Sequence, residues 1–193
     1  MTEREVLLTG IGGQGVQLAA QVLARAAVLE DRHVLLFGVY GGAMRGMNTD
    51  ATVVVGDAPI QAPPLVSRAW SAIAMHDRYW SPVAPKVVDG ALVVVNDATF
   101  AAPLDERFTV RRIPAGELAA AAGNELAASM VILGAYVGLT GVVGVDALLG
   151  GMRESVPAYR RQHLEVNERA LRAGLDRVEP LAVPAWQREA ASA

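Results

Sequence analysis

The sequence contains no cysteine among its 193 residues. This absence excludes disulfides, a thiol nucleophile and a cysteine-ligated iron–sulfur cluster within the chain. An excess of positive charge is also absent, because the formal net charge is −3 and no arginine-rich stripe is present. We therefore expect no nucleic-acid partner, since nucleic-acid binding depends on concentrated positive charge.

Aromatic residues are scarce, at 5%, whereas hydrophobic residues make up 52% of the chain. The core must therefore be built mainly from Ala, Val and Leu. This composition supplies more apolar surface than a chain of this length easily hides, so it predicts a buried subunit interface, with a homodimer as one form. The first ten residues, MTEREVLLTG, contain acids and no apolar signal core. We therefore expect a cytoplasmic protein.

One apolar run, Leu126–Val145, extends for 20 residues without a charge and meets the crude length criterion for a membrane span. Glycines interrupt the run, acids flank it, and neither end has an excess of Lys or Arg. We favour a shorter buried helix and expect no membrane contact. Gly134 and Gly138 would let another backbone approach this helix closely. Because few large side chains remain to cover this face, we expect it to contribute to the subunit interface.

Strand and helix patterns alternate in the first half of the chain, and helices dominate the second half. This order predicts an α/β fold, a three-layer α/β/α domain with a mostly parallel sheet and a helical C-terminal part. The predicted strands cover residues 5–9, 33–37, 49–55, 69–75, 91–96 and 108–113. The predicted helices cover residues 16–29, the segment AGELAAAAG, the run from Leu126, a segment capped by Asp146, and residues 158–175 ending near Gly174.

We expect one domain over residues 1–178 and a Pro/Ala-rich tail over residues 179–193. The tail contains Trp186, a large aromatic side chain in a segment of small residues. Trp186 would dock either on the domain or on a partner.

Four glycines in six positions separate the first predicted strand from the first predicted helix. The motif Gly10-x-Gly12-x-x-Gly15 fits the dinucleotide-binding pattern, and free N–H groups at a helix N-terminus favour anions. A dinucleotide site also needs an acid near the end of the second strand, but Glu30 and Asp31 precede that strand. An NAD site is therefore the weaker interpretation. A tight turn without a ligand stays open as a further alternative.

A second loop, VYGGAMRGMN, follows the second predicted strand. Because the carboxyl ends of parallel strands share one edge of a sheet, we expect the two loops to open at the same edge. Arg45 is the cation of this loop, and its guanidinium would bind a phosphate or a partner's carboxylate. A solvated loop arginine is the alternative.

Three segments, GIGGQGVQLAAQVLARAA, VYGGAMRGMNTDATVVVG and VNERALRAG, resemble the gamma subunit, or fused gamma domain, of the 2-oxoacid:ferredoxin oxidoreductases. The resemblance runs from about Val6 to Val178. In that family, thiamine diphosphate and iron–sulfur clusters lie in other subunits, and the gamma part helps to bind coenzyme A in members that use it. The resemblance implies a cofactor-binding site at the signature positions Gly12, Gly13, Gln14, Gly15, Tyr40, Gly41, Arg45 and Gly46.

The resemblance also implies a subunit that is not catalytic alone. The complex would decarboxylate a 2-oxoacid oxidatively and pass electrons to ferredoxin, with alpha/beta (thiamine-binding) and ferredoxin-like subunits as partners. The sequence departs from the family pattern at Met47, which replaces a glycine and adds bulk where a ligand would approach. Two alternatives are a free-standing nucleotide- or coenzyme A-binding protein and an NAD-dependent oxidoreductase.

We expect no catalytic residue and no metal site in this chain. His76 and Asp77 follow a predicted strand, and adjacent strand residues point to opposite faces, so a catalytic dyad is not expected. His163 is expected on the exposed face of a helix. Asn167 is expected to be buried and hydrogen-bonded to a neighbouring loop rather than to a ligand.

Overall fold

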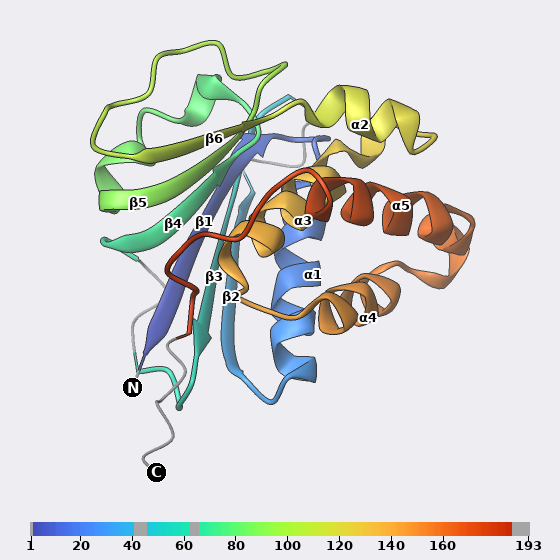
Figure 1. The fold of residues 1–193 in the computed structure, drawn as a ribbon, viewed down its shortest axis with the longest axis horizontal. Coiled ribbons are helices and arrows are strands. Elements are labelled where there is room, and N and C mark those ends of the chain that lie inside the picture. The colour runs from blue at the N-terminus through green and yellow to red at the C-terminus, as the bar shows by residue number, and fades with distance from the viewer. Residues whose placement is uncertain (1, 41–45, 62–65, 187–193) are drawn as a thin grey trace.

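The computed structural model describes residues 2–40, 46–61 and 66–186, which form a six-stranded sheet covered by helices (Figure 1). The strands are β1 (Glu3–Ile11), β2 (His33–Tyr40), β3 (Asn48–Gly56), β4 (Ala69–Ala74), β5 (Val87–Asn96) and β6 (Thr109–Ile113). Their order is β2-β3-β1-β4-β5-β6. β1, β4, β5 and β6 pair in parallel, whereas β3 is antiparallel to both β1 and β2. The predicted α/β class and mostly parallel sheet are therefore confirmed.

The α-helices of the described residues gather on one face of the sheet (Figure 1). They are α1 (Val16–Leu29), α2 (Ala115–Ala121), α3 (Ala128–Thr140), α4 (Val145–Ser155) and α5 (Leu164–Leu175). Four of them follow β6, so the helical C-terminal part is also confirmed. α1 has the predicted bounds, because its small apolar residues recur on the face that meets the sheet.

Shorter elements cover the opposite face of the sheet. They include the 3₁₀ turns η1 (Asp77–Tyr79) and η2 (Ala84–Lys86). The Trp80 ring lies edge-on to Phe100 and Phe108, with centroid distances of 6.0 and 5.8 Å. These three buried rings belong to the apolar cluster on the sheet face opposite the α-helices. The layer on this face consists of short turns and loops and is therefore thinner than the helical layer.

The long apolar run forms the 13-residue helix α3, preceded by the 3₁₀ turn η3 (Glu125–Ala127) and ended by Gly141 in the left-handed conformation. No helix in the described part of the chain is long and apolar enough to cross a membrane. α5 packs directly on α3: a methyl group added at Gly134 would fall against the Leu171 carbonyl group, and one added at Gly174 against that of Val131. The Gly134 and Gly138 face is thus covered within the chain, and the expectation that it is left for a partner is wrong.

Two predicted helix features differ in the structure. Residues 158–175 are not one helix, because η4 (Ala158–His163) is a 3₁₀ turn and α5 begins only at Leu164. Residues 158–163 are all exposed, so no packing supports an α-helical turn there. Gly144, not Asp146, is the N-cap of α4, and its N–H donates a 2.7 Å hydrogen bond to Glu30 Oε1.

The segment that follows α5 returns to the end of α3. The Leu181 N–H donates to the Leu139 carbonyl oxygen at 2.9 Å, and the Ala185 N–H donates to that of Thr140 at 2.8 Å. Trp186 Nε1 donates to the Val142 carbonyl oxygen at 2.9 Å, and the Arg32 guanidinium lies 4.1 Å from a Trp186 ring centroid. Of the two expected docking sites for Trp186, the structure shows the one on the domain itself.

Candidate functional site

The glycine loop joins the carboxyl end of β1 to the N-terminus of α1. Gly13 and Gly15 have φ angles of 105° and 79°, a backbone conformation that strongly favours glycine. Gly15 is the N-cap of α1, and as a glycine it has no side chain to accept a hydrogen bond from the first turn. The partial positive charge of this helix end is therefore left for another acceptor.

Gln14 is bonded within the loop. Its Oε1 accepts a 2.8 Å hydrogen bond from the Ile11 N–H, and its Nε2 donates to the Met75 carbonyl oxygen at 3.4 Å. The side chain thus ties the loop to the ends of β1 and β4. The amide that stood out in the sequence as a ligand candidate contributes first to the shape of the loop.

The two glycine-containing loops meet at one edge of the sheet, as the sequence predicts. The Gly12 N–H donates to the Met47 carbonyl oxygen at 2.8 Å, and the Gly46 N–H donates to that of Gly12 at 3.2 Å. The Met47 side chain is 47% exposed. The backbone of Tyr40 ends β2, whereas two further signature residues, Gly41 and Arg45, lie outside the described residues.

A polar cluster that the sequence analysis missed supports this edge. The Asp50 carboxylate accepts hydrogen bonds from Thr9 Oγ1 at 2.7 Å and from Asn48 Nδ2 at 2.9 Å. Gln17 Nε2 donates to the Asp50 carbonyl oxygen at 2.7 Å, which links α1 to β3. In the sequence, the one signal for this cluster was Asp50 itself, an acidic residue near the start of a strand rich in β-branched residues.

The sheet order bears on the dinucleotide interpretation. In a dinucleotide-binding fold, the strand that carries the ribose-binding acid lies beside β1. Here the antiparallel β3 lies between β1 and β2, so the end of β2 is displaced by one strand from the glycine loop. This arrangement removes the geometric support for NAD binding.

A cavity of about 690 Å³, here called the α1 groove, opens beside Gly13. It lies between α1 on one side and the end of α4, η4 and α5 on the other. Its lining residues are Gly13, Leu18, Gln21, Asn124, Leu126, Ser155, Val156, Pro157, Arg160, His163 and Asn167. The α1 groove therefore adds polar and cationic side chains to the glycine loop.

The sequence predictions for two groove residues, His163 and Asn167, have different outcomes. His163 is exposed as expected, but it lines the α1 groove. Asn167 is buried as expected, yet it makes no side-chain hydrogen bond with any described residue and lines the groove instead. The expectation of a hydrogen bond to a neighbouring loop is therefore wrong among the described residues.

Comparison with known proteins places this loop and groove in a family. The model of the pyruvate ferredoxin/flavodoxin oxidoreductase family matches residues 5–177. The chain belongs to this family. The match covers most of the chain and includes the glycine loop, both neighbouring helices of the groove and α5.

Two curated relatives of this oxidoreductase family member come from Methanothermobacter thermautotrophicus. The 2-oxoglutarate synthase subunit KorC is 32% identical over 80% of this chain and 85% of its own length. The ketoisovalerate oxidoreductase subunit VorA is 30% identical over 97% of this chain, which spans only 37% of VorA.

Two solved structures share the fold of this family member. The gamma subunit of a keto/oxoacid ferredoxin oxidoreductase from Geobacter sulfurreducens has a TM-score of 0.76 at 23% identity, covering 90% of this chain and 96% of that one. The 2-oxoglutarate:ferredoxin oxidoreductase from Magnetococcus marinus, solved with 2-oxoglutarate, coenzyme A and succinyl-CoA bound, has a TM-score of 0.79 at 16% identity. This match covers 95% of the present chain but only 34% of the Magnetococcus marinus chain.

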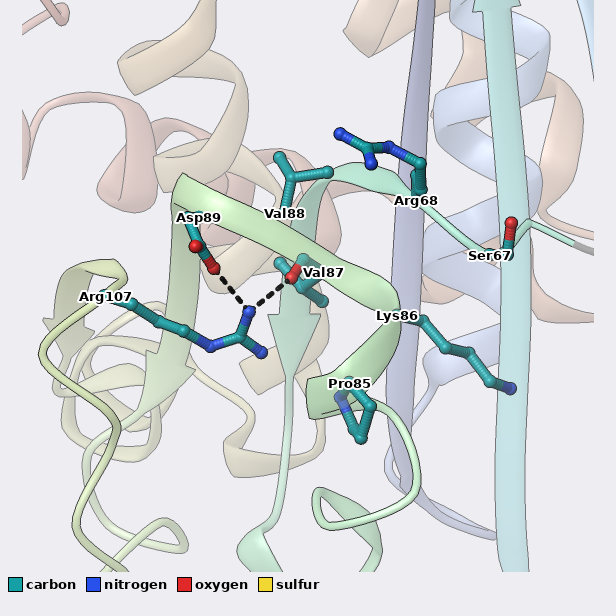
Figure 2. Close-up of a pocket in the computed structure, with 8 residues that line it drawn as sticks. All are labelled: Ser67, Arg68, Pro85, Lys86, Val87, Val88, Asp89 and Arg107. Carbon is teal, nitrogen blue, oxygen red and sulfur yellow. Dashed lines mark hydrogen bonds and ion pairs between the residues drawn. The ribbon is translucent and has the colours of Figure 1, made fainter.

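A second cavity, here called the β5 pocket, has a volume of about 430 Å³ and lies beside the amino end of β5 (Figure 2). Its Arg107 makes three hydrogen bonds: Nη1 donates to Asp89 Oδ1 at 2.7 Å and to the Val87 carbonyl oxygen at 3.1 Å, and Nη2 donates to that of Ala84 at 2.7 Å. Figure 2 shows the Arg68 and Lys86 side chains pointing in different directions. The β5 pocket therefore does not gather its cations around one point.

His76 and Asp77 meet, contrary to the sequence expectation. His76 Nδ1 lies 2.9 Å from Asp77 Oδ1, because both residues lie beyond the end of β4 and strand alternation no longer separates them. Asp77 Oδ2 also accepts hydrogen bonds from the N–H groups of Ala101 and Ala102, both at 3.1 Å. Burial raises the pKa of Asp77, but these N–H groups and His76 outweigh it and hold the pKa below its ordinary value of 3.8. Asp77 thus fastens the segment after β5 to the end of β4.

Proposed function

We propose that this chain is the gamma subunit of a 2-oxoacid:ferredoxin oxidoreductase. The family match over residues 5–177 carries the proposal. KorC, which this chain matches over 85% of its length, is a subunit of 2-oxoglutarate synthase, and the Geobacter sulfurreducens protein of the same fold is a gamma subunit. The reaction would be the oxidative decarboxylation of a 2-oxoacid with electrons passed to ferredoxin.

The chemistry of this reaction needs thiamine diphosphate and iron–sulfur clusters, which supply carbanion stabilisation and one-electron transfer. The residues of this chain do not fit the clusters, because the sequence contains no cysteine. No group of His, Asp or Glu in its described residues could hold a metal ion. We therefore assign both cofactors to partner subunits, an alpha/beta thiamine-binding part and a ferredoxin-like part.

The contribution of this chain would be a scaffold and an anion site for the phosphates of coenzyme A. Three observations support the site: the N-terminus of α1, whose N-cap Gly15 has no side chain, the left-handed backbone of Gly13 and Gly15, and the adjoining α1 groove. The Magnetococcus marinus enzyme, whose fold includes a similar region, was solved with coenzyme A bound. Arg45 would complete the site from the second loop.

The experiment is reconstitution with the products of neighbouring genes. Co-expression should yield a complex that contains this chain and reduces a viologen dye when a 2-oxoacid and coenzyme A are supplied. The purified chain alone should show no turnover, because it has no cluster and no thiamine site. A chain that gains no mass with those gene products, or turns over a 2-oxoacid alone, would refute the proposal.

The anion site needs a separate test, in which coenzyme A is titrated calorimetrically into the wild-type chain and an Arg45→Ala variant. We expect weaker binding in the variant, since a guanidinium is lost beside the helix end. A Gly13→Val variant is a poor probe, because a side chain at a φ angle of 105° strains the loop itself. Unchanged affinity in Arg45→Ala would place the site elsewhere.

A further inference from the structure

The sheet has two edge strands, β2 and β6, which differ in length and in chemistry (Figure 1). β6 has five residues, and two of them are Arg111 and Arg112. Shortness and charge are devices that keep a sheet edge from pairing with another chain. β2 has eight residues, HVLLFGVY, with no proline, lysine, arginine or acidic residue. The sequence thus protects one edge of the sheet and leaves the other suited to pairing.

The backbone of β2 can accept a further strand along its whole length. β2 pairs with β3 in an unbroken register from His33–Gly56 to Tyr40–Thr49. In the sheet of the described residues, β3 is its one neighbour. Alternate residues of an edge strand direct their N–H and C=O groups away from the neighbour. At about 3.4 Å per residue, β2 offers an edge of about 27 Å.

The side chains of β2 leave apolar surface on both faces of this edge. A methyl group added at Gly38 would meet Gln17 of α1, so Gly38 faces the helical layer. Strand alternation therefore directs Leu36 to the helical face and Phe37 to the opposite face. Each of these side chains is 40% exposed. A strand beside β2 would cover both.

More apolar side chains are exposed at the ends of β2. α1 ends three residues before β2 begins, and α4 begins beside Gly144, whose N–H donates to Glu30 in that connection. Specific interfaces bury about 800 Å² on each partner, and side chains around a strand extend its contact toward that area. Six of the nine large hydrophobic side chains exposed in the described part of the chain lie in β2 or near its ends: Val28, Leu29, Leu36, Phe37, Met47 and Val145.

A second copy of this chain fits the β2 edge by symmetry. Two identical strands pair antiparallel about a two-fold axis perpendicular to the sheet, which places residues of the same face opposite one another. With the axis at Leu36, the two Leu36 side chains meet on the helical face. Leu35 then lies opposite Phe37 on the other face, and such aliphatic–aromatic pairs stabilise a sheet. Because β2 contains no Lys, Arg, Asp or Glu, pairing with its own copy brings no like charges together.

We propose that two copies of this chain join their β2 strands, antiparallel about a two-fold axis at Leu36, into one continuous sheet. Backbone hydrogen bonds between the two strands fix the register, and the exposed apolar side chains near β2 become buried. The glycine face of α3 takes no part, because α5 covers it. The inference goes beyond the proposed function, since it concerns contact between two copies of this subunit.

Single-cysteine variants of the full chain test the register, because the wild-type chain contains no cysteine. Opposite residues of an antiparallel pair have Cα atoms about 4.5–5.5 Å apart, within the range of about 4.4–6.8 Å that a disulfide spans. Leu36→Cys should therefore form a disulfide-linked dimer under mild oxidation. The matched control is Thr109→Cys, exposed on the β6 edge, which should cross-link at least about tenfold more slowly. Equal rates would indicate random collision and overturn the inference.

Sedimentation over a range of micromolar concentrations tests the contact without a cross-link. The wild-type chain should form a dimer, and Leu36→Lys should raise the dimer Kd at least about tenfold, because two like charges would face each other at the axis. Thr109→Lys, the control on β6, should change this Kd less than about twofold. Thermal unfolding checks that both variants fold, and Phe37→Lys replaces Leu36→Lys if the latter does not.

The remaining outcomes separate this inference from the proposed function. A chain that is monomeric at every concentration, or a dimer that Leu36→Lys does not weaken, would overturn the inference. In the complex reconstituted with the neighbouring gene products, a disulfide from Leu36→Cys to another subunit would assign the edge to that subunit and also overturn it. The subunit assignment would stand in each case. A β2-linked dimer that gains no mass with those gene products would support the inference and refute the proposed function.

Discussion

The α1 groove and the β5 pocket both contain arginine, but the two arginines have different surroundings. In the β5 pocket, Arg107 donates to Asp89 and to the Val87 carbonyl oxygen (Figure 2). It also donates to the Ala84 carbonyl oxygen, so its guanidinium is part of the fold. In the α1 groove, Arg160 has no carboxylate beside it among the lining residues. A guanidinium that is hydrogen-bonded to neighbouring loops stabilises the protein, whereas one with no carboxylate among the residues lining its groove is available to a ligand.

Position in the sheet explains this difference. The α1 groove opens beside the carboxyl end of β1, where the N-cap of α1 is a glycine without a side chain to accept from the first turn. The β5 pocket lies at the amino end of β5, where loop carbonyl groups accept from Arg107 instead. In α/β sheets, ligands bind outside the carboxyl ends of the strands, and this chain follows that rule.

The largest expected effect on stability concerns the contact between α3 and α5. The α1 groove depends on this contact because α5 forms one of its walls, whereas the β5 pocket does not. Gly134→Val would drive a side chain into the Leu171 backbone, which has no rotamer with which to yield. We expect the unfolding free energy to fall by about 3 kcal/mol or more in a denaturant titration.

The matched control is Gly116→Ala in α2, where an added methyl group meets no atom within 4 Å. This substitution should raise the unfolding free energy by about 0.5–1 kcal/mol, because alanine favours a helix over glycine. A Gly134→Val variant as stable as wild type would contradict the close contact between α3 and α5.

An intermediate effect is expected from Arg107→Ala in the β5 pocket. Removing three hydrogen bonds from one guanidinium should lower the unfolding free energy by about 1.5–3 kcal/mol and leave phosphate binding unchanged. Arg160→Gln should do the reverse, with stability within about 0.5 kcal/mol of wild type and weaker phosphate binding. Thermal unfolding and phosphate titration of both variants test these opposite effects. Loss of phosphate binding in Arg107→Ala would contradict the difference proposed between the two cavities.

The smallest effect concerns the outer face of α5. The Arg153 and Arg172 guanidinium groups donate to Glu168 at 2.8 and 3.0 Å and hold its pKa below the ordinary value of 4.5, against the effect of burial. A carboxyl group with a lowered folded pKa stabilises the protein fully above its unfolded pKa, and this stability is lost as pH falls through the folded value.

Glu168→Gln should therefore lower stability by about 0.5–1 kcal/mol at pH 7, since these arginines are half exposed. Unfolding curves from pH 7 to below pH 4.5 should show a smaller acid-induced loss of stability in this variant than in wild type. Parallel curves would mean that the pair does not contribute. Phosphate binding should stay unchanged at pH 7, because Glu168 does not line the α1 groove.

Several elements could be predicted because their patterns are local. The bounds of α1 follow from a run of small apolar residues between Gly15 and Glu30, and β2 begins at the predicted residue. The meeting of the two glycine loops followed from the common direction of β1 and β2. Features that depend on a remote partner were missed or wrong: the Asp50 cluster and the cap of α4. The contact of His76 with Asp77 was missed for a different reason, because strand alternation was applied to residues that lie beyond the end of β4.

The amino-acid sequence by itself determined the α/β class, the glycine loop at the head of α1 and the exclusion of cysteine-bound clusters. These conclusions depend on residue spacing, backbone freedom and side-chain chemistry, which act over a few neighbouring residues. Only the tertiary structure decided that α5 covers the glycine face of α3, that β3 separates β1 from β2, and that Asn167 lines the α1 groove. Each of these depends on which surfaces meet across long separations in the chain, and local periodicity does not specify that choice.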